Sequence, residues 1–197
     1  MKFRTIAAAT AILAIVAEPT WAHPTVAPTL PFAWGHGFLH PWLGLDHLLA
    51  MLAVGMAAVY FGGRARILLP ATFLVAMAGG GLIGASAVAS ATAEFFAAAS
   101  LLALGLVLAS GRRYPLGIAI FVAAILGIFH GHLHGTELAS GAVIAVWSGL
   151  LSATAILHLL GGLSAWAISC AVPHRHGLRI AGSILAITGG LLALIAI

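Results

Sequence analysis

The stretch HPWLGLDHLLAMLAVG, residues 40–55, decides the fold of this chain. It opens with His40 and Pro41, places Asp46 and His47 shortly after them, and continues as an uninterrupted apolar run. Such a run suits a helix in lipid, where an unpartnered charge costs about 3 kcal/mol or more. The carboxylate and the imidazoles therefore need a partner, and a metal cation is the obvious one.

The composition predicts an all-α integral membrane protein. The 197 residues are 62% hydrophobic and 6% charged, with a mean hydropathy of +1.16, whereas soluble domains are about 25% charged. The cations stand in short loops between apolar runs and form no basic face of the kind that nucleic acid requires. The one cysteine, Cys170, lies in an apolar run, which excludes a disulfide framework or a cysteine-rich metal site.

Residues 1–22 are typical of a secretory signal peptide. Lys2 and Arg4 precede an apolar run that is too short to span a bilayer, and small residues stand at the positions that specify cleavage after Ala22. The alternative is an uncleaved anchor. Cleavage would make His23 the new N-terminus, where an amine beside an imidazole can chelate a metal.

Residues 23–197 are predicted to form one domain, a six-helix transmembrane bundle. Pro24, Pro28 and Pro31 argue against a regular helix in residues 25–38, and Pro41 suits the first turn of the first span. The predicted spans cover residues 41–61, 67–88, 93–109, 115–134, 143–170 and 180–197.

The arginines predict the orientation of the bundle. After cleavage all six lie in the loops at residues 62–66, 110–114 and 173–179, which alternate with loops that hold none. Cytoplasmic loops are enriched in such cations. We therefore expect a bacterial-type cytoplasmic (inner) membrane protein with both mature termini outside.

The same topology gathers the metal-binding residue types near the outer face. They are Asp46, Glu94, Glu137, His23, His36, His40, His47, His130, His132 and His134. His158 lies near mid-span, and His174 and His176 lie in an inner loop. A lone histidine in a membrane is more often a hydrogen-bonded packing residue than a ligand, so His158 is a weaker candidate. Several histidines and carboxylates on one side are not typical of packing.

Helical rotation predicts which of these side chains share a face. His130 and His134 are about 40° apart, and Glu137 lies within about 60° of His134, provided that the helix continues through Gly135. His132 points roughly the opposite way. In the first span, His40 and His47 should be nearly eclipsed, with Asp46 about 100° away.

A separate glycine stripe, Gly127, Gly131 and Gly135, is suited to close contact with another helix. It lies beside the face that carries His130 and His134.

This donor set points to a borderline divalent cation. Imidazoles with one or two carboxylates and no thiolate suit Ni²⁺, Co²⁺, Zn²⁺ or Cu²⁺. From the residues alone, the choice among these four stays open.

Two motifs resemble those of the HupE/UreJ family. Residues 40–55 meet every fixed position of HPxxGxDHxxAMxAVG, and FHGHLHGTE at residues 129–137 is similar to FHGxAHGxE, with Leu133 in place of alanine. The resemblance implies a nickel or cobalt permease that serves hydrogenase or urease maturation. By matching positions it implies metal residues at His40, Asp46, His47, His130, His134 and Glu137. The weaker candidates are His23, His36, His132, His158 and Glu94.

We therefore expect a secondary transporter that imports Ni²⁺ or Co²⁺, with the lipid bilayer and the metal ion as its partners and no required cofactor. The chain has no phosphate-binding loop of the GxxxxGK[ST] type and no HExxH motif. These features argue against ATP hydrolysis and against an enzyme. The alternatives are a metal-binding accessory protein or sensor that does not transport and, with less support, an intramembrane metalloenzyme.

Overall fold

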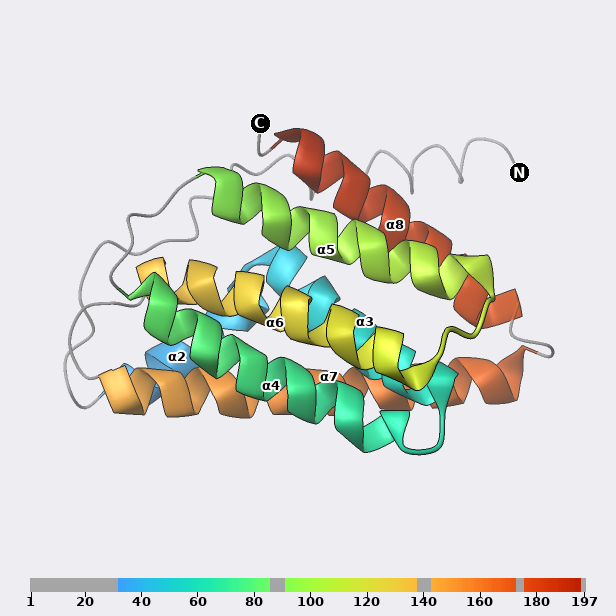
Figure 1. Ribbon diagram of the computed structural model, residues 1–197, viewed down its shortest axis with the longest axis horizontal. Helices are drawn as coiled ribbons and strands as arrows, with labels where there is room; N and C mark the ends of the chain where they lie inside the picture. Colours follow the sequence, from blue (N-terminus) through green and yellow to red (C-terminus); the bar gives the residue numbers. More distant parts are fainter. Residues whose placement is uncertain (1–31, 86–90, 138–142, 173–175, 196–197) are drawn as a thin grey trace.

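The computed structural model describes residues 32–85, 91–137, 143–172 and 176–195. Every regular element in these ranges is an α-helix, and the ribbon is shown in Figure 1. The helices are α2 (Ala33–Leu43), α3 (Leu45–Phe61), α4 (Ala65–Gly84), α5 (Ala91–Ser110), α6 (Leu116–Glu137), α7 (Val143–Ala171) and α8 (His176–Ile195).

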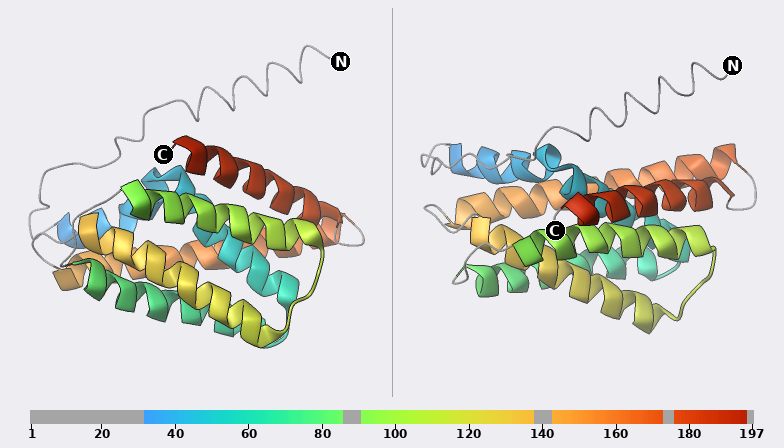
Figure 2. Two further views of the ribbon diagram at one scale, coloured as in Figure 1. Left: turned by 45° about the horizontal axis from the view of Figure 1, so that its top comes forward. Right: turned by 90° about the horizontal axis from the view of Figure 1, so that it is seen from above.

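The helices form an elongated bundle of closely packed pairs. α4 lies along α6, α5 lies along α8, and both α2 and α3 lie against α7 (Figures 1 and 2). α3 also contacts α4 and α5, so that it connects the pairs at the centre of the bundle.

Glycines bring the paired backbones into direct contact. On α6, a Cβ atom added to Gly127 would lie 2.6 Å from the Phe73 carbonyl oxygen of α4, and one added to Gly131 would overlap the Met77 carbonyl. Gly135 meets the Gly81 carbonyl in the same way. Small residues allow this approach between helices in lipid. The predicted role of the glycine stripe is thereby confirmed.

In the other helix pairs, glycines also contact the backbone of the partner helix. Gly37 of α2 meets the Val146 backbone of α7, and Gly149 of α7 meets the Trp34 backbone of α2. Between α5 and α8, Gly105 lies against the backbone of Ala186. At these glycines the paired helices therefore touch backbone against backbone.

The outward faces of the helices are apolar. Ile67, Val75 and Leu82 of α4 are 74%, 74% and 79% exposed. Side chains of this kind suit contact with lipid rather than water. The structure therefore agrees with the expectation of an all-α membrane protein.

The predicted six-span count is not confirmed. Among the described residues, α4, α6, α7 and α8 are long and apolar enough to cross a membrane, and α2 with α3 would be a fifth crossing as a bent pair. In α5, the apolar stretch Phe95–Ser110 is shorter than a span requires. The six-span layout stays a prediction, and the signal peptide lies outside the described residues.

The predicted start of the first span is wrong. Helix α2 already begins at Ala33, within the stretch expected to lack a regular helix, and Pro41 lies inside it. The chain breaks instead at Gly44, whose backbone is extended (φ −92°, ψ 119°), and α3 leaves at 83° to α2. The close contact of Gly37 and Gly149 with backbone on the opposite helix explains why α2 forms against α7.

The described arginines lie at one end of the bundle. α3 ends and α4 begins there, as do α5 and α6, and α7 and α8 (Figure 1). Arg179 at this end donates a hydrogen bond to the Ala109 carbonyl oxygen at 3.1 Å. The common position of these loops matches the predicted alternation; the side of the membrane that they face stays a prediction.

The close backbone contacts predict opposite effects of two alanine substitutions. Gly105→Ala should destabilise the protein, because overpacking a tight contact costs about 1–3 kcal/mol. Gly79→Ala on α4, where a Cβ atom would meet nothing within 4 Å, should be neutral or stabilising, because alanine is the better helix former by about 1 kcal/mol. Thermal unfolding in detergent measures both. Equal effects would contradict the packing role of Gly105.

The orientation predicts an extracytoplasmic C-terminus. A reporter that is active only in the cytoplasm, fused after Ile197, should stay inactive, because six crossings from an outside N-terminus return the chain to the outside. An active reporter would show an odd number of crossings or the opposite orientation. The same reporter fused after Gly63, in a loop that we place inside, is the positive control.

Candidate metal centre

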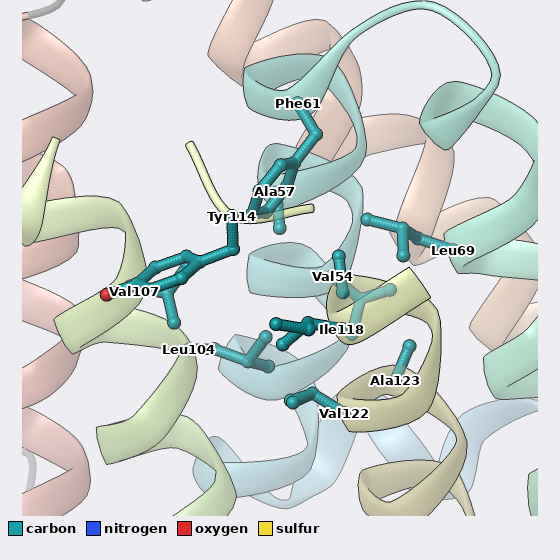
Figure 3. A pocket seen from close by; sticks show the side chains of 11 residues that line it. Val54, Ala57, Phe61, Leu69, Leu104, Val107, Tyr114, Ile118, Val122 and Ala123 are labelled. Atoms are coloured by element: carbon teal, nitrogen blue, oxygen red, sulfur yellow. The ribbon is translucent and has the colours of Figure 1, made fainter. Parts of the chain in front are cut away.

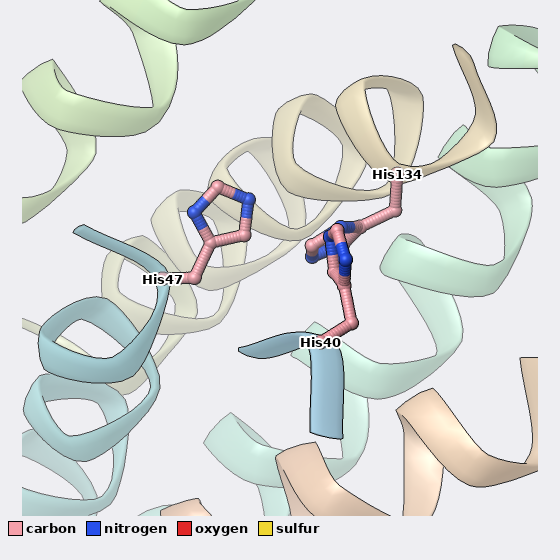
Figure 4. A group of neighbouring side chains, drawn as sticks. All are labelled: His40, His47 and His134. Carbon is pink, nitrogen blue, oxygen red and sulfur yellow. The ribbon is translucent and has the colours of Figure 1, made fainter. Parts of the chain in front are cut away.

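Three histidines from three helices converge at the end of the bundle opposite the arginines. His40 lies in the last turn of α2, His47 in the first turns of α3, and His134 near the end of α6. Figure 4 shows the three side chains directed toward one another. We call His40, His47 and His134 the outer group.

The bend at Gly44 creates this arrangement. The sequence predicted His40 and His47 nearly eclipsed on one helix; they lie on two helices instead, with ring centroids 5.9 Å apart. A Cβ atom on residue 44 would lie 3.2 Å from Asp46 Oδ1 and 3.3 Å from His47 Nδ1. Glycine therefore leaves room for both side chains beside the break.

The distances within the outer group suit a shared cation. The ring of His134 lies 4.9 Å from that of His40 and 4.6 Å from that of His47, measured between centroids. One nitrogen from each ring can be chosen so that all three lie within 4.8 Å of one another. Nitrogen ligands about 2.1 Å from one ion lie at most about 4.2 Å apart. A small rotation of the rings thus places all three in one coordination sphere.

Burial differs across the outer group in a way that gives it an open side. His134 is 0% exposed and His47 is 6% exposed, whereas His40 is half-buried. An ion held between the three rings would therefore lose its water first on the side of His134 and His47. His40 is the most exposed member of the group.

Asp46 lies against His47 rather than in the group of converging nitrogens. Its Oδ1 atom is 2.8 Å from His47 Nδ1. A carboxylate at this position favours the tautomer with the proton on Nδ1, which leaves the Nε2 lone pair for a cation. In this arrangement the carboxylate of Asp46 orients the imidazole ring of His47.

His130 extends the group inward by one turn of α6. Its ring centroid is 5.7 Å from that of His47, and its Nδ1 atom is 3.1 Å from the Leu126 carbonyl oxygen. A carbonyl only accepts, so Nδ1 carries the proton and the neutral ring presents Nε2 as the acceptor. His130 and His134 share a face as predicted, because α6 continues through Gly135 to Glu137.

The remaining candidates are placed as follows. His36 is half-buried on α2, with its ring 6.5 Å from that of His40. His132 is half-buried on α6 and is not one of the three converging residues. Glu94 and Glu137 lie in α5 and α6, but their side chains are outside the described part of the structure, as is the whole of His23.

Phe73 of α4 lies beside the site, although no sequence motif pointed to this residue. Its ring lies 5.6 Å from that of His130 and 5.2 Å from that of His158 on α7. It is fully buried. A single phenylalanine in an apolar helix forms no recognisable motif. Only the packing of α4 against α6 and α7 shows that Phe73 lies beside the histidines.

Comparison with known proteins agrees with these motifs. The family model for the HupE / UreJ protein matches residues 11–192. This chain belongs to the HupE/UreJ family. It is 38% identical to Protein HupE of Rhizobium leguminosarum bv. viciae over 198 residues, which cover 98% of each chain. No solved structure matches it.

The fold brings residues of the two motifs together. Both motifs of this HupE/UreJ chain supply the outer group: His40 and His47 come from the first, and His134 comes from the second. Two segments about 90 residues apart in the chain thus meet at one place.

The outer group predicts which histidines determine metal affinity. His134→Ala should weaken Ni²⁺ binding to the purified protein about tenfold or more, because it removes one of three converging nitrogens. Isothermal titration in detergent measures the affinity. His132→Ala, on the same helix but outside the group, is the matched control and should bind as the unaltered protein does. A larger loss in His132→Ala than in His134→Ala would contradict this site.

Proposed function

We propose that this protein is a secondary transporter that imports Ni²⁺ or Co²⁺ across the cytoplasmic membrane and supplies the maturation of a metalloenzyme such as hydrogenase or urease. The observation that carries the proposal is the convergence of His40, His47 and His134 within a membrane bundle. Membership of the HupE/UreJ family supports the same conclusion.

The donor set supports a transition metal as the cargo. Imidazole nitrogens suit nickel, cobalt, zinc and copper, whereas Mg²⁺ and Ca²⁺ prefer oxygen ligands. Cys170, the only thiol, is exposed in the last turn of α7, far from the outer group. The site therefore offers nitrogen with nearby carboxylate, which favours Ni²⁺ over Co²⁺ and strongly disfavours Mn²⁺.

Each residue has a distinct part in this proposal. The outer group takes the ion from solvent through His40, and Asp46 holds His47 with its Nε2 atom toward the ion. His130 offers the next nitrogen inward. Glu137, from the same motif as His130, completes the proposed donor set as an oxygen ligand.

The membrane potential provides a driving force for inward movement. A divalent cation that crosses toward a negative interior gains about 4.6 kcal/mol for each 100 mV. The chain carries no nucleotide-binding motif that would supply energy in another way. Transport down the electrochemical gradient is therefore sufficient for uptake.

Proteoliposome uptake tests this function. The full-length protein, with the potential clamped negative inside, should accumulate radiolabelled Ni²⁺ with time, and Asp46→Asn should lower the initial rate about 10- to 100-fold, because a residue that orients a ligand is lost. Empty liposomes are the control. Binding without accumulation would contradict transport and favour the alternative, a metal-binding accessory protein or sensor.

Proton competition provides a second test. Imidazoles must be neutral to bind a metal, so lowering the outside pH should reduce the uptake rate at low Ni²⁺, and saturating Ni²⁺ should restore part of it. Initial rates are measured at both metal concentrations with the potential clamped. An identical pH effect at low and at saturating metal would show that protons do not compete at the histidines.

A further inference from the structure

His158 is a buried imidazole that packing alone does not explain. It lies near the middle of α7 and is 3% exposed. Among the described residues, neither of its ring nitrogens has a hydrogen-bond partner. A buried polar group without a partner costs free energy, and such groups in a native structure call for a functional reason.

Thr154 lies one helical turn before His158 and has the same property. It is 0% exposed, and within the described part of the chain its hydroxyl has no hydrogen-bond partner. The serines of α7 behave differently: each donates to a carbonyl three or four residues earlier. These are Ser148, Ser152, Ser164 and Ser169. Thr154 thus keeps a buried oxygen that its helix does not use.

Both side chains lie on the face of α7 that is buried in the bundle. Residues four apart in a helix are neighbours on one face, and α7 packs this face against α3, where Gly55 meets the His158 carbonyl. Two donors of different kinds, a nitrogen and an oxygen, are therefore held one turn apart. The pair defines what we call the inner site, His158 and Thr154.

A line of rings connects the outer group to the inner site. His134 lies next to His47, and His47 lies next to His130. The Phe73 ring is a neighbour of both His130 and His158, with centroid distances of 5.6 Å and 5.2 Å. His130 is one turn inward of His134, and His158 is the next imidazole along this line.

The nearby pocket offers no competing route for a cation. It lies between α3, α4, α5 and α6 and is lined almost entirely by apolar side chains, among them Val54, Leu104 and Val122 (Figure 3). Tyr114, which carries the hydroxyl at this pocket, directs it toward the side of Val107 and away from Val54, Leu69 and Ala123 (Figure 3). A divalent ion that enters this pocket would lose its water without gaining ligands.

We infer that His158 and Thr154 form a second, inner binding site, which takes the divalent transition metal from the outer group as it moves inward. This inference rests on the transport function proposed above. Two protein donors hold an ion more weakly than three imidazoles and a carboxylate. Weak binding suits a site that an ion must both enter and leave, because conduction through several sites requires each to release its ion.

Uptake and binding, measured separately, test the inner site. In proteoliposomes, His158→Asn should lower the initial rate of Ni²⁺ uptake about tenfold or more, because a metal ligand is lost. Equilibrium Ni²⁺ binding at the outer group should be unchanged, which also shows that the variant is folded. Thr154→Val, which keeps the shape but removes the oxygen, should lower the rate less. Uptake by His158→Asn at the rate of the unaltered protein would overturn the inference while leaving transport intact.

A spectroscopic test does not depend on transport. His158→Cys in a Cys170→Ser background places the only thiol of the chain at the inner site. Addition of Co²⁺ should produce a thiolate-to-cobalt charge-transfer band, because a thiolate binds such ions tightly. Leu157→Cys in the same background is equally buried but points elsewhere, and should give no band.

The two tests separate the two proposals. Absence of the band in His158→Cys would overturn the inner site, whether or not the chain transports. A band in His158→Cys together with no accumulation of Ni²⁺ by the unaltered protein would support a metal at this depth and refute transport.

Discussion

Close contact between helix backbones is the constraint on which this structure depends. In lipid, apolar side chains gain little by leaving their surroundings, so helices associate through tight packing. The glycines of α6 against α4, of α2 and α3 against α7, and of α5 against α8 let backbones touch where a Cβ atom would not fit. These contacts set the depth and rotation of each helix, and hence the position of every histidine that the helices carry.

The convergence of His40, His47 and His134 follows from that packing together with one break in the chain. α2 is held against α7, and α3 leaves at 83° after Gly44, so His40 and His47 approach each other from two directions. The α4–α6 contact fixes the rotation of α6, which turns His130 and His134 toward the same space. The buried imidazoles of His47 and His130 are tolerated there because each has a partner for its Nδ1 atom. Asp46 contacts Nδ1 of His47, and the Leu126 carbonyl oxygen contacts Nδ1 of His130.

Along the route proposed for the ion, the number of protein donors falls from the outer group to the inner site. The outer group combines three imidazoles with a nearby carboxylate and an open side, whereas His158 and Thr154 lie deeper and offer two donors. Such a gradient allows capture at low metal concentration outside and release inside. An accessory protein that only stores metal has no need of buried donors along the bundle. A test of the inner site therefore also helps to distinguish a transporter from such an accessory protein.

The sequence by itself determined the class of protein and predicted the donors. Composition identified an all-α membrane protein, the two motifs identified the family and predicted the metal residues, and the spacing of Gly127, Gly131 and Gly135 predicted a contact face. These features are local, because each depends on helical periodicity or residue type alone. Only the tertiary structure decided that α2 is a helix, that the break comes at Gly44 rather than before Pro41, and that Asp46 faces His47. It also placed Phe73 next to both His130 and His158. These features depend on which backbones touch across the bundle, and residues distant in the sequence carry no local signal of that contact.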